Sequence, residues 1–147
     1  MFRLVTLAVV ALLLVACSGE SEGEADRDLD ESIALVEMVP EVMKVVRVTE
    51  DNDPHDLAGR SEGVLAVAVV YDSRLECQSL SIECGAIIEK WPDRGEAKSR
   101  SESVKAHQQG MPMLGTEYHF LEGDTLLRVE GKLSKDQAAE YEKAFTG

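Results

Sequence analysis

Near the end of the chain, four polar side chains have the types that acid–base chemistry or ligand binding would use. They are Glu117, His119, Arg128 and Glu130. A histidine beside carboxylates can move protons, but catalysis also needs a nucleophile or a metal ion, and neither is visible near these residues. We therefore interpret the four as a possible binding face. We expect them to form a solvent-exposed charge network in which each pair contributes less than about 1 kcal/mol.

The acidic segment 51–56 has some features of a calcium-binding loop, and Glu62 follows eleven places after Asp51. However, Asp56 stands where such a loop needs glycine, and His55 stands where it needs an oxygen ligand. The alternative is a turn in which Asp and Asn side chains accept hydrogen bonds from their own backbone. We favour the turn, and we predict neither a metal ion nor another cofactor.

Cys17 is a third candidate for chemistry, because it ends an apolar run of 13 residues that starts at Leu4. Arg3 supplies a positive charge before the run, and a small residue stands just before the cysteine. These three parts are typical of a secretory signal peptide. The run is too short to be a transmembrane helix, which needs about 20 apolar residues.

The residues Leu14-Val15-Ala16-Cys17 resemble the lipobox of bacterial lipoproteins. The resemblance implies that residues 1–16 are a cleaved lipoprotein signal peptide and that Cys17 becomes the acylated first residue of the mature chain. One acyl chain holds a protein only reversibly, so a stable anchor needs two or three. The alternative is a secreted protein with a free thiol at Cys17. The lipoprotein interpretation predicts a location in the bacterial cell envelope, with the anchor on the extracytoplasmic side of a membrane.

Cys77 and Cys84 are the other two of the three cysteines, an even pair in a chain that we expect to be exported. We predict a disulfide bond between them, which closes a small ring and contributes about 2.5 kcal/mol by the chain-entropy estimate. A zinc site is the alternative. It fits poorly, because six residues separate the cysteines and no second Cys/His pair completes a tetrahedral set.

Residues 18–32 hold seven acidic side chains and one basic one, together with glycines and serines. Such a segment cannot bury enough apolar area to fold, so we predict that residues 17–32 are the lipidated cysteine and a disordered tether. As a flexible coil the tether would reach about 20 Å. The whole chain has 15 basic and 28 acidic residues, a net charge of -13, which argues against a nucleic-acid partner.

Residues 33–147 have the size and apolar content of a single domain. Hydrophobic spacing and turn residues predict helices at 28–39, after Asp93 and after Ser134, and strands at 44–49, 64–71 and 86–91, followed by a β-hairpin at 116–130. The element order is helix, three strands, helix, β-hairpin and C-terminal helix. It predicts an α+β domain with an antiparallel sheet of about five strands and helices mainly on one face.

Three side-chain patterns sharpen these expectations. In the hairpin, a two-residue turn sets Phe120 opposite Leu127 and Tyr118 opposite Val129. The strand at 64–71 carries larger residues on one face and alanines on the other, so the alanine face must be closely covered or lightly packed. One side of the helix after Asp93 is lined by Ala97, Ser101, Val104, Gln108 and Met111.

The sequence contains no Gly-x-Ser-x-Gly elbow, phosphate loop, His-Glu-x-x-His motif or dinucleotide fingerprint. The stretches 53–60, 111–118 and 136–141 resemble segments of small bacterial envelope lipoproteins of unassigned function. That resemblance implies an anchored extracytoplasmic domain and transfers no catalytic residue.

We therefore expect a binding or accessory module of the cell envelope and not an enzyme. Its partners would be the membrane, through the lipid anchor, and another envelope protein. One alternative is a structural or regulatory subunit of an envelope complex, and an exposed apolar patch would support it. The other alternative is a small hydrolase with an unrecognised site, and a cleft with converging titratable groups would support it.

Overall fold

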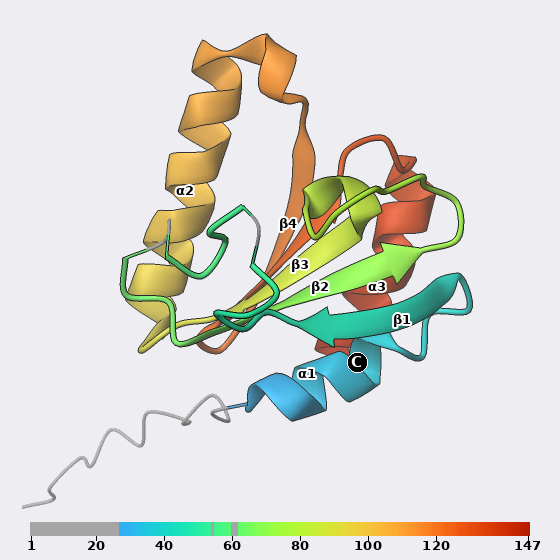
Figure 1. Ribbon diagram of the computed structural model, residues 1–147, viewed down its shortest axis with the longest axis horizontal. Coiled ribbons are helices and arrows are strands. Elements are labelled where there is room, and N and C mark those ends of the chain that lie inside the picture. The colour runs from blue at the N-terminus through green and yellow to red at the C-terminus, as the bar shows by residue number, and fades with distance from the viewer. Residues whose placement is uncertain (1–26, 54, 60–61) are drawn as a thin grey trace, which may run out of the picture.

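The computed structural model describes residues 27–53, 55–59 and 62–147, and Figure 1 shows its architecture. In these ranges the chain forms three α-helices and a five-stranded antiparallel sheet, which confirms the predicted α+β class. The helices are α1 (Leu29–Val36), α2 (Arg94–Gly110) and α3 (Lys135–Thr146). The strands are β1 (Val42–Arg47), β2 (Ala66–Asp72), β3 (Gly85–Lys90), β4 (Glu117–Glu122) and β5 (Thr125–Glu130). Two short 3-10 helices are η1 (Ile82–Cys84) and η2 (Pro112–Leu114).

The strand order is β1-β2-β3-β5-β4. After β3, the chain passes through α2 to the far edge of the sheet, where β4 lies, and the hairpin then returns β5 to the side of β3. The last strand therefore lies inside the sheet. This position brings side chains of β5 next to those of β3, although the two strands are far apart in the sequence.

The predicted tether is wrong at its C-terminal end. Leu29 and Ser32 are buried residues of α1, and the side chain of Asp28 caps this helix by accepting a hydrogen bond from the backbone N–H of Glu31. Burial of the apolar side of α1 outweighs the acidity of the segment. The predicted signal peptide and Cys17 lie outside the described residues.

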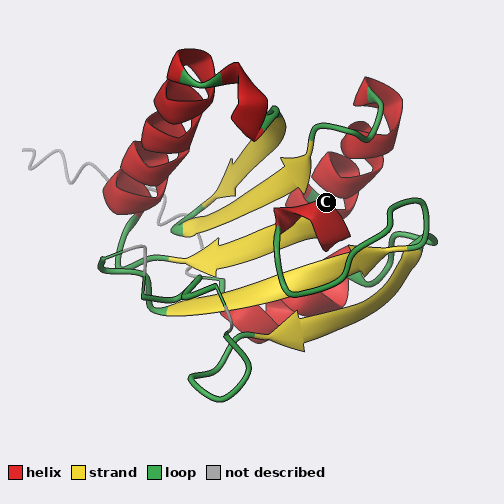
Figure 2. Ribbon diagram, turned by 45° about the horizontal axis from the view of Figure 1, so that its top comes forward, coloured by secondary structure: helices red, strands yellow, loops and turns green. Residues whose placement is uncertain are grey.

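One face of the sheet carries the main apolar core, and α1 and α3 cover it. Figure 2 shows α2 apart from these two helices, over the β4 end of the sheet. Ala68 and Ala86 belong to this core, and their small side chains let the helices approach closely. The alanine face of β2 is thus the closely covered one. Leu65, by contrast, precedes β2 and is 63% exposed.

We call the opposite side of the sheet the cleft face. At its β2–β3 end, Val67, Val69 and Ile87 pack against Leu80 and Cys84 of the segment that ends in η1. At its β5 end, α2 packs over β4 and β5. The segment and α2 cover different parts of this face, and a cavity lies between them.

The hairpin has the predicted register. Phe120 pairs with Leu127, Tyr118 pairs with Val129, and Glu122 pairs with Thr125 across a two-residue turn. The predicted starts of α2 and α3 are also confirmed. Asp93 accepts a hydrogen bond from the Glu96 backbone N–H, and Ser134 forms a reciprocal capping box with Gln137.

Candidate functional site

A cleft of about 1020 Å³ opens on the cleft face. Its floor includes Val67 and Ile87 on the apolar side and Glu89 and Arg128 on the charged side. One wall is the segment 76–83, and Arg100 of α2 forms part of the other. The volume is that of a site for a small molecule or a short chain segment. We call this site the binding cleft.

The wall formed by 76–83 is held by a disulfide bond. Cys77 is bonded to Cys84, as predicted, with 4.7 Å between the Cα atoms. Leu80, in the middle of the ring, is buried against the sheet. At the mouth of the cleft, the Oγ atom of Ser79 lies 2.7 Å from Nε2 of His55, so the ring is also linked to the loop around residue 55.

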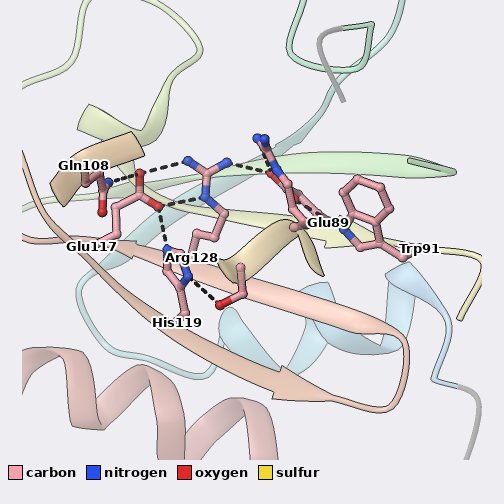
Figure 3. Close-up of polar contacts among 8 residues, drawn as sticks. Glu89, Trp91, Gln108, Glu117, His119 and Arg128 are labelled. Carbon is pink, nitrogen blue, oxygen red and sulfur yellow. Dashed lines mark hydrogen bonds and ion pairs between the residues drawn. The ribbon is translucent and has the colours of Figure 1, made fainter. Parts of the chain in front are cut away.

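Arg128 is the centre of the charged floor, as Figure 3 shows. Its Nε and Nη2 atoms donate hydrogen bonds of 2.7 and 2.8 Å to the two carboxylate oxygens of Glu117, and its Nη1 donates one of 2.6 Å to Glu89. One guanidinium therefore joins two carboxylates from the strands on either side of β5. The planar fork of arginine suits this bidentate geometry.

Glu89 is the second centre of the floor. In addition to the hydrogen bond from Arg128, its carboxylate accepts hydrogen bonds of 3.2 and 3.3 Å from Nε and Nη2 of Arg100. The indole Nε1 of Trp91 donates a further bond of 3.3 Å. These donors hold the Glu89 side chain, which is only 4% exposed, in one position at the base of the cleft.

Glu117 is held from the α2 side as well. The amide of Gln108 donates a 2.9 Å hydrogen bond to it, and Nε2 of His119 lies 3.1 Å from its Oε2. The other ring nitrogen of His119 lies 2.8 Å from Oγ of Ser101. A continuous polar network thus runs from α2 through the hairpin to β3.

The pKa shifts of Glu117 and Arg128 favour their charged forms. Burial alone would raise the pKa of Glu117, but the hydrogen bonds with His119 and Arg128 and the positive charge of Arg128 lower it to about 2. Burial alone would lower the pKa of Arg128, but its contacts with Glu117 and Glu89 raise it. Both groups are therefore ionised at neutral pH.

The prediction that these residues form an exposed face is wrong. The side chains of His119, Glu117 and Arg128 are 1%, 5% and 10% exposed. They are buried because α2 covers β4 and β5 and places Ser101 and Gln108 directly on them. Charge pairs shielded from water are coupled more strongly than the predicted surface pairs.

Glu130, the fourth predicted residue, does not join the network through a hydrogen bond. It is 6% exposed and accepts a bond of 3.1 Å from the backbone N–H of Lys132. Burial raises the pKa of Glu130, and the negative charges of Glu117 and Glu83 raise it further. Of the four predicted residues, only Arg128 lines the binding cleft.

Sequence reasoning missed Glu89, Arg100 and Trp91 as members of the site. The available signal was Glu89, because the alternation of the strand at 86–91 places this charged residue on the same face as the apolar Ile87. A second signal was Ser101, which shares one side of α2 with Ala97 and Val104, because a polar side chain that is buried beside apolar ones needs a polar partner.

The acidic loop forms the turn that we favoured. Asp53 accepts hydrogen bonds from the backbone N–H groups of Leu57 and Ala58, and the side chain of Asn52 bonds to the backbone of Arg47 and Thr49. Outside the gaps at 1–26, 54 and 60–61, no three His, Cys, Asp or Glu side chains are grouped to hold a metal ion.

The same described ranges contain no helix that is both long and apolar enough to cross a bilayer. In comparisons with known proteins, no family model, no curated protein and no solved structure matches the chain.

Proposed function

We propose that this protein is a lipid-anchored binding module of the bacterial cell envelope, which receives a segment of another envelope protein in the binding cleft and does not catalyse a reaction. The observation that carries the proposal is the cleft itself, whose charged floor is held in place by a buried hydrogen-bond network. A pre-formed concave site of this size, lined by both apolar and polar groups, is typical of ligand binding.

The lipobox-like sequence supports the envelope location, and so does the bond between Cys77 and Cys84. Disulfide bonds persist in oxidising compartments such as the bacterial periplasm and are rare in the cytosol. The proposed anchor and the disulfide therefore point to the same side of the membrane.

The lining of the cleft favours a partner segment with apolar and basic side chains. Leu57 and Ile82, which are partly exposed, offer apolar contact. Glu76 and Glu83 place exposed carboxylates at the edge of the ring, and Glu83 lies 3.6 Å from Nζ of the equally exposed Lys132. The two arginines of the lining, Arg100 and Arg128, are already bonded to carboxylates of the protein. Because the charges of these arginines are compensated, they do not attract an acidic partner. The acidic edge and the net charge of -13 therefore favour a partner segment with basic side chains.

The arrangement of Ser101, His119 and Glu117 supports binding over hydrolysis. These residues form a serine–histidine–carboxylate chain, but none of them lines the cleft, and the side chain of His119 is 1% exposed. A nucleophile must reach its substrate. Moreover, the lowered pKa of Glu117 suits an ion pair and opposes a role as a general acid.

Photo-crosslinking in intact cells tests this proposal. A photoreactive amino acid in place of Gln78, an exposed residue of the cleft wall, should give an adduct with one envelope protein, identified by mass spectrometry. The same amino acid in place of Glu142, exposed on α3 behind the sheet, is the positional control. The paired change Glu76→Lys and Glu83→Lys should reduce the Gln78 adduct, whereas Glu142→Lys should not.

Absence of a specific adduct from Gln78, or the same adducts from both positions, would overturn the proposed binding site. An adduct that is insensitive to the lysine variants would overturn the proposed basic partner.

One observation favours a second candidate, a structural or regulatory subunit of an envelope complex. Three apolar side chains lie exposed at the end of α2 and in η2: Met111 (46%), Met113 (89%) and Leu114 (54%). Exposed apolar side chains that are neighbours in space often mark protein contacts. A photoreactive amino acid at Met113 that gives an adduct, with none from Gln78, would favour this candidate over the binding cleft.

A further inference from the structure

The two sulfur atoms of the disulfide lie in different surroundings. Cys84 is 1% exposed and belongs to the apolar cluster on β2 and β3. Cys77 is partly exposed and lines the binding cleft. A thiol that enters the cleft can therefore reach Cys77, while the protein interior shields Cys84.

The bond also determines how the cleft wall is held. Within the described part of the chain, no backbone N–H of residues 76–80 donates to a backbone carbonyl. What holds this segment is the bond to Cys84, the burial of Leu80 and the contact between Ser79 and His55. Cys84 itself directly precedes β3 and stays fixed to the sheet. Loss of the bond would therefore release the Cys77 side of the ring.

We propose that the Cys77–Cys84 disulfide is a thiol–disulfide exchange site that is attacked at Cys77, and that its reduction opens the wall of the binding cleft. The partner in the exchange is a protein dithiol, the chemical class of a disulfide oxidoreductase. The effect on ligand binding rests on the proposed function; the exchange site does not.

The exchange proceeds in two balanced steps. A thiolate of the dithiol attacks Sγ of Cys77, the bond to Cys84 breaks, and Sγ of Cys84 leaves with the electron pair and takes up a proton. The second thiolate of the dithiol then attacks its partner sulfur in the mixed disulfide, and Cys77 leaves as a thiolate that takes up a proton. The dithiol becomes a disulfide, so two electrons and two protons pass to the protein.

Two matched variants test the difference in access. Cys84→Ser leaves a free thiol at Cys77, and Cys77→Ser leaves one at Cys84. In the folded full-length protein at about pH 8, Ellman's reagent should react with the Cys77 thiol at least about tenfold faster than with the Cys84 thiol. The two rates should become equal in denaturant, and the double variant Cys77→Ser/Cys84→Ser measures any contribution from Cys17. Equal rates in the folded protein, or a faster Cys84, would overturn the exchange site.

Hydrogen exchange measured by mass spectrometry tests the opening of the wall. After reduction of the wild-type protein, amides of residues 76–79 should exchange faster while those of β2 and β3 keep their rates, and the double serine variant should behave like the reduced protein. Unchanged exchange at 76–79 would refute the opening.

The crosslinking experiment separates the two proposals. If the adduct from Gln78 forms in the wild type and is lost in the double serine variant, the cleft is redox-gated. If the adduct forms equally in both, the gate is refuted and the proposed function stands. If the adduct forms in neither while Cys77 reacts faster, the proposed function fails and the exchange site stands.

Discussion

Arg128 and Glu117 form a bidentate ion pair, with hydrogen bonds of 2.7 and 2.8 Å, beneath helix α2. Their side chains are only 10% and 5% exposed, so water contributes little to solvating either charge. Each group therefore depends on the other, and both position the floor of the binding cleft.

The variant Glu117→Gln should destabilise the protein by about 3–5 kcal/mol, because it removes the charge that compensates a buried arginine. Urea denaturation at pH 7 measures this loss. The matched control is Glu102→Gln on α2, where Glu102 is 67% exposed and lies 3.9 Å from Lys98. The control should change stability by less than about 0.5 kcal/mol. Similar losses of unfolding free energy in the two variants would contradict the conclusion that the Glu117 carboxylate compensates a buried arginine.

Stability should fall in acid because of Glu117. Its pKa is about 2 in the folded protein and 4.5 without perturbation, so the folded state binds this proton less readily than the unfolded state. The stabilising contribution is complete above pH 4.5 and is lost as the pH falls toward 2. Burial alone would raise the pKa of Asp72, but hydrogen bonds from Arg74 and Tyr141 lower it. Protonation of Asp72 therefore adds to the loss of stability in acid.

The measurement is the difference in unfolding free energy between wild type and Glu117→Gln as a function of pH. The difference should be constant near neutrality and shrink below pH 4.5. A difference that does not depend on pH would argue against the lowered pKa.

Tyr141→Phe should cost about 1–3 kcal/mol, because the hydroxyl of this fully buried residue donates a 2.7 Å hydrogen bond to the buried carboxylate of Asp72. Tyr118→Phe is the control. The Tyr118 hydroxyl donates a longer bond, 3.2 Å, to the backbone carbonyl of Leu133 from a partly buried position. We expect its loss to cost less than about 1 kcal/mol by thermal or urea unfolding. A loss in Tyr141→Phe no greater than the small loss expected for Tyr118→Phe would show that Asp72 does not need the phenol.

Gly85→Ala and Gly110→Ala should change stability in opposite directions. Gly85 has a φ of +152°, and a Cβ atom there would lie 2.9 Å from Cβ of Asp72 and 2.9 Å from the carbonyl oxygen of Val70. Alanine should therefore destabilise the start of β3. Gly110 lies in α2 with no neighbour within 4 Å of such a Cβ, so alanine there should stabilise by up to about 1 kcal/mol. Melting temperatures of the two variants measure both effects, and a shift of the same sign would refute the comparison.

Cys17→Ala should release the protein from membranes, because the proposed acyl chains can no longer be attached. Fractionation of cells followed by an alkaline wash of the membrane pellet measures the release. Cys77→Ser, which alters a cysteine of the folded domain, is the control and should remain in the pellet. Recovery of Cys17→Ala in the washed pellet would count against the lipid anchor.

Much of the local structure could be predicted because its causes lie within a few residues. Asp93 and Ser134 bond to backbone N–H groups three residues ahead, so the starts of α2 and α3 are visible in the sequence. The turn at Gly123 likewise sets the register of the hairpin, because a two-residue loop permits only one alignment of the apolar residues.

The location of the site could not be predicted in the same way. The partners of its key contacts are distant in the sequence: Arg128 and Glu89 are 39 residues apart, and His55 and Ser79 are 24 apart. The two-residue turn that sets Phe120 opposite Leu127 also sets His119 opposite Arg128. The alternation of the strands, however, determines only which residues share a face. It does not say whether that face meets water or a helix.

For this protein, the sequence by itself determined the α+β class, the helix starts, the hairpin register and the pairing of Cys77 with Cys84, because hydrogen bonds over short spacings and the cysteine count suffice for these. Only the tertiary structure decided that β5 lies beside β3 and that α2 covers the polar face of the hairpin. The physical reason is that strand order and helix docking depend on how whole elements bury their surfaces against each other. That burial converted an expected surface charge network into the buried floor of a cleft.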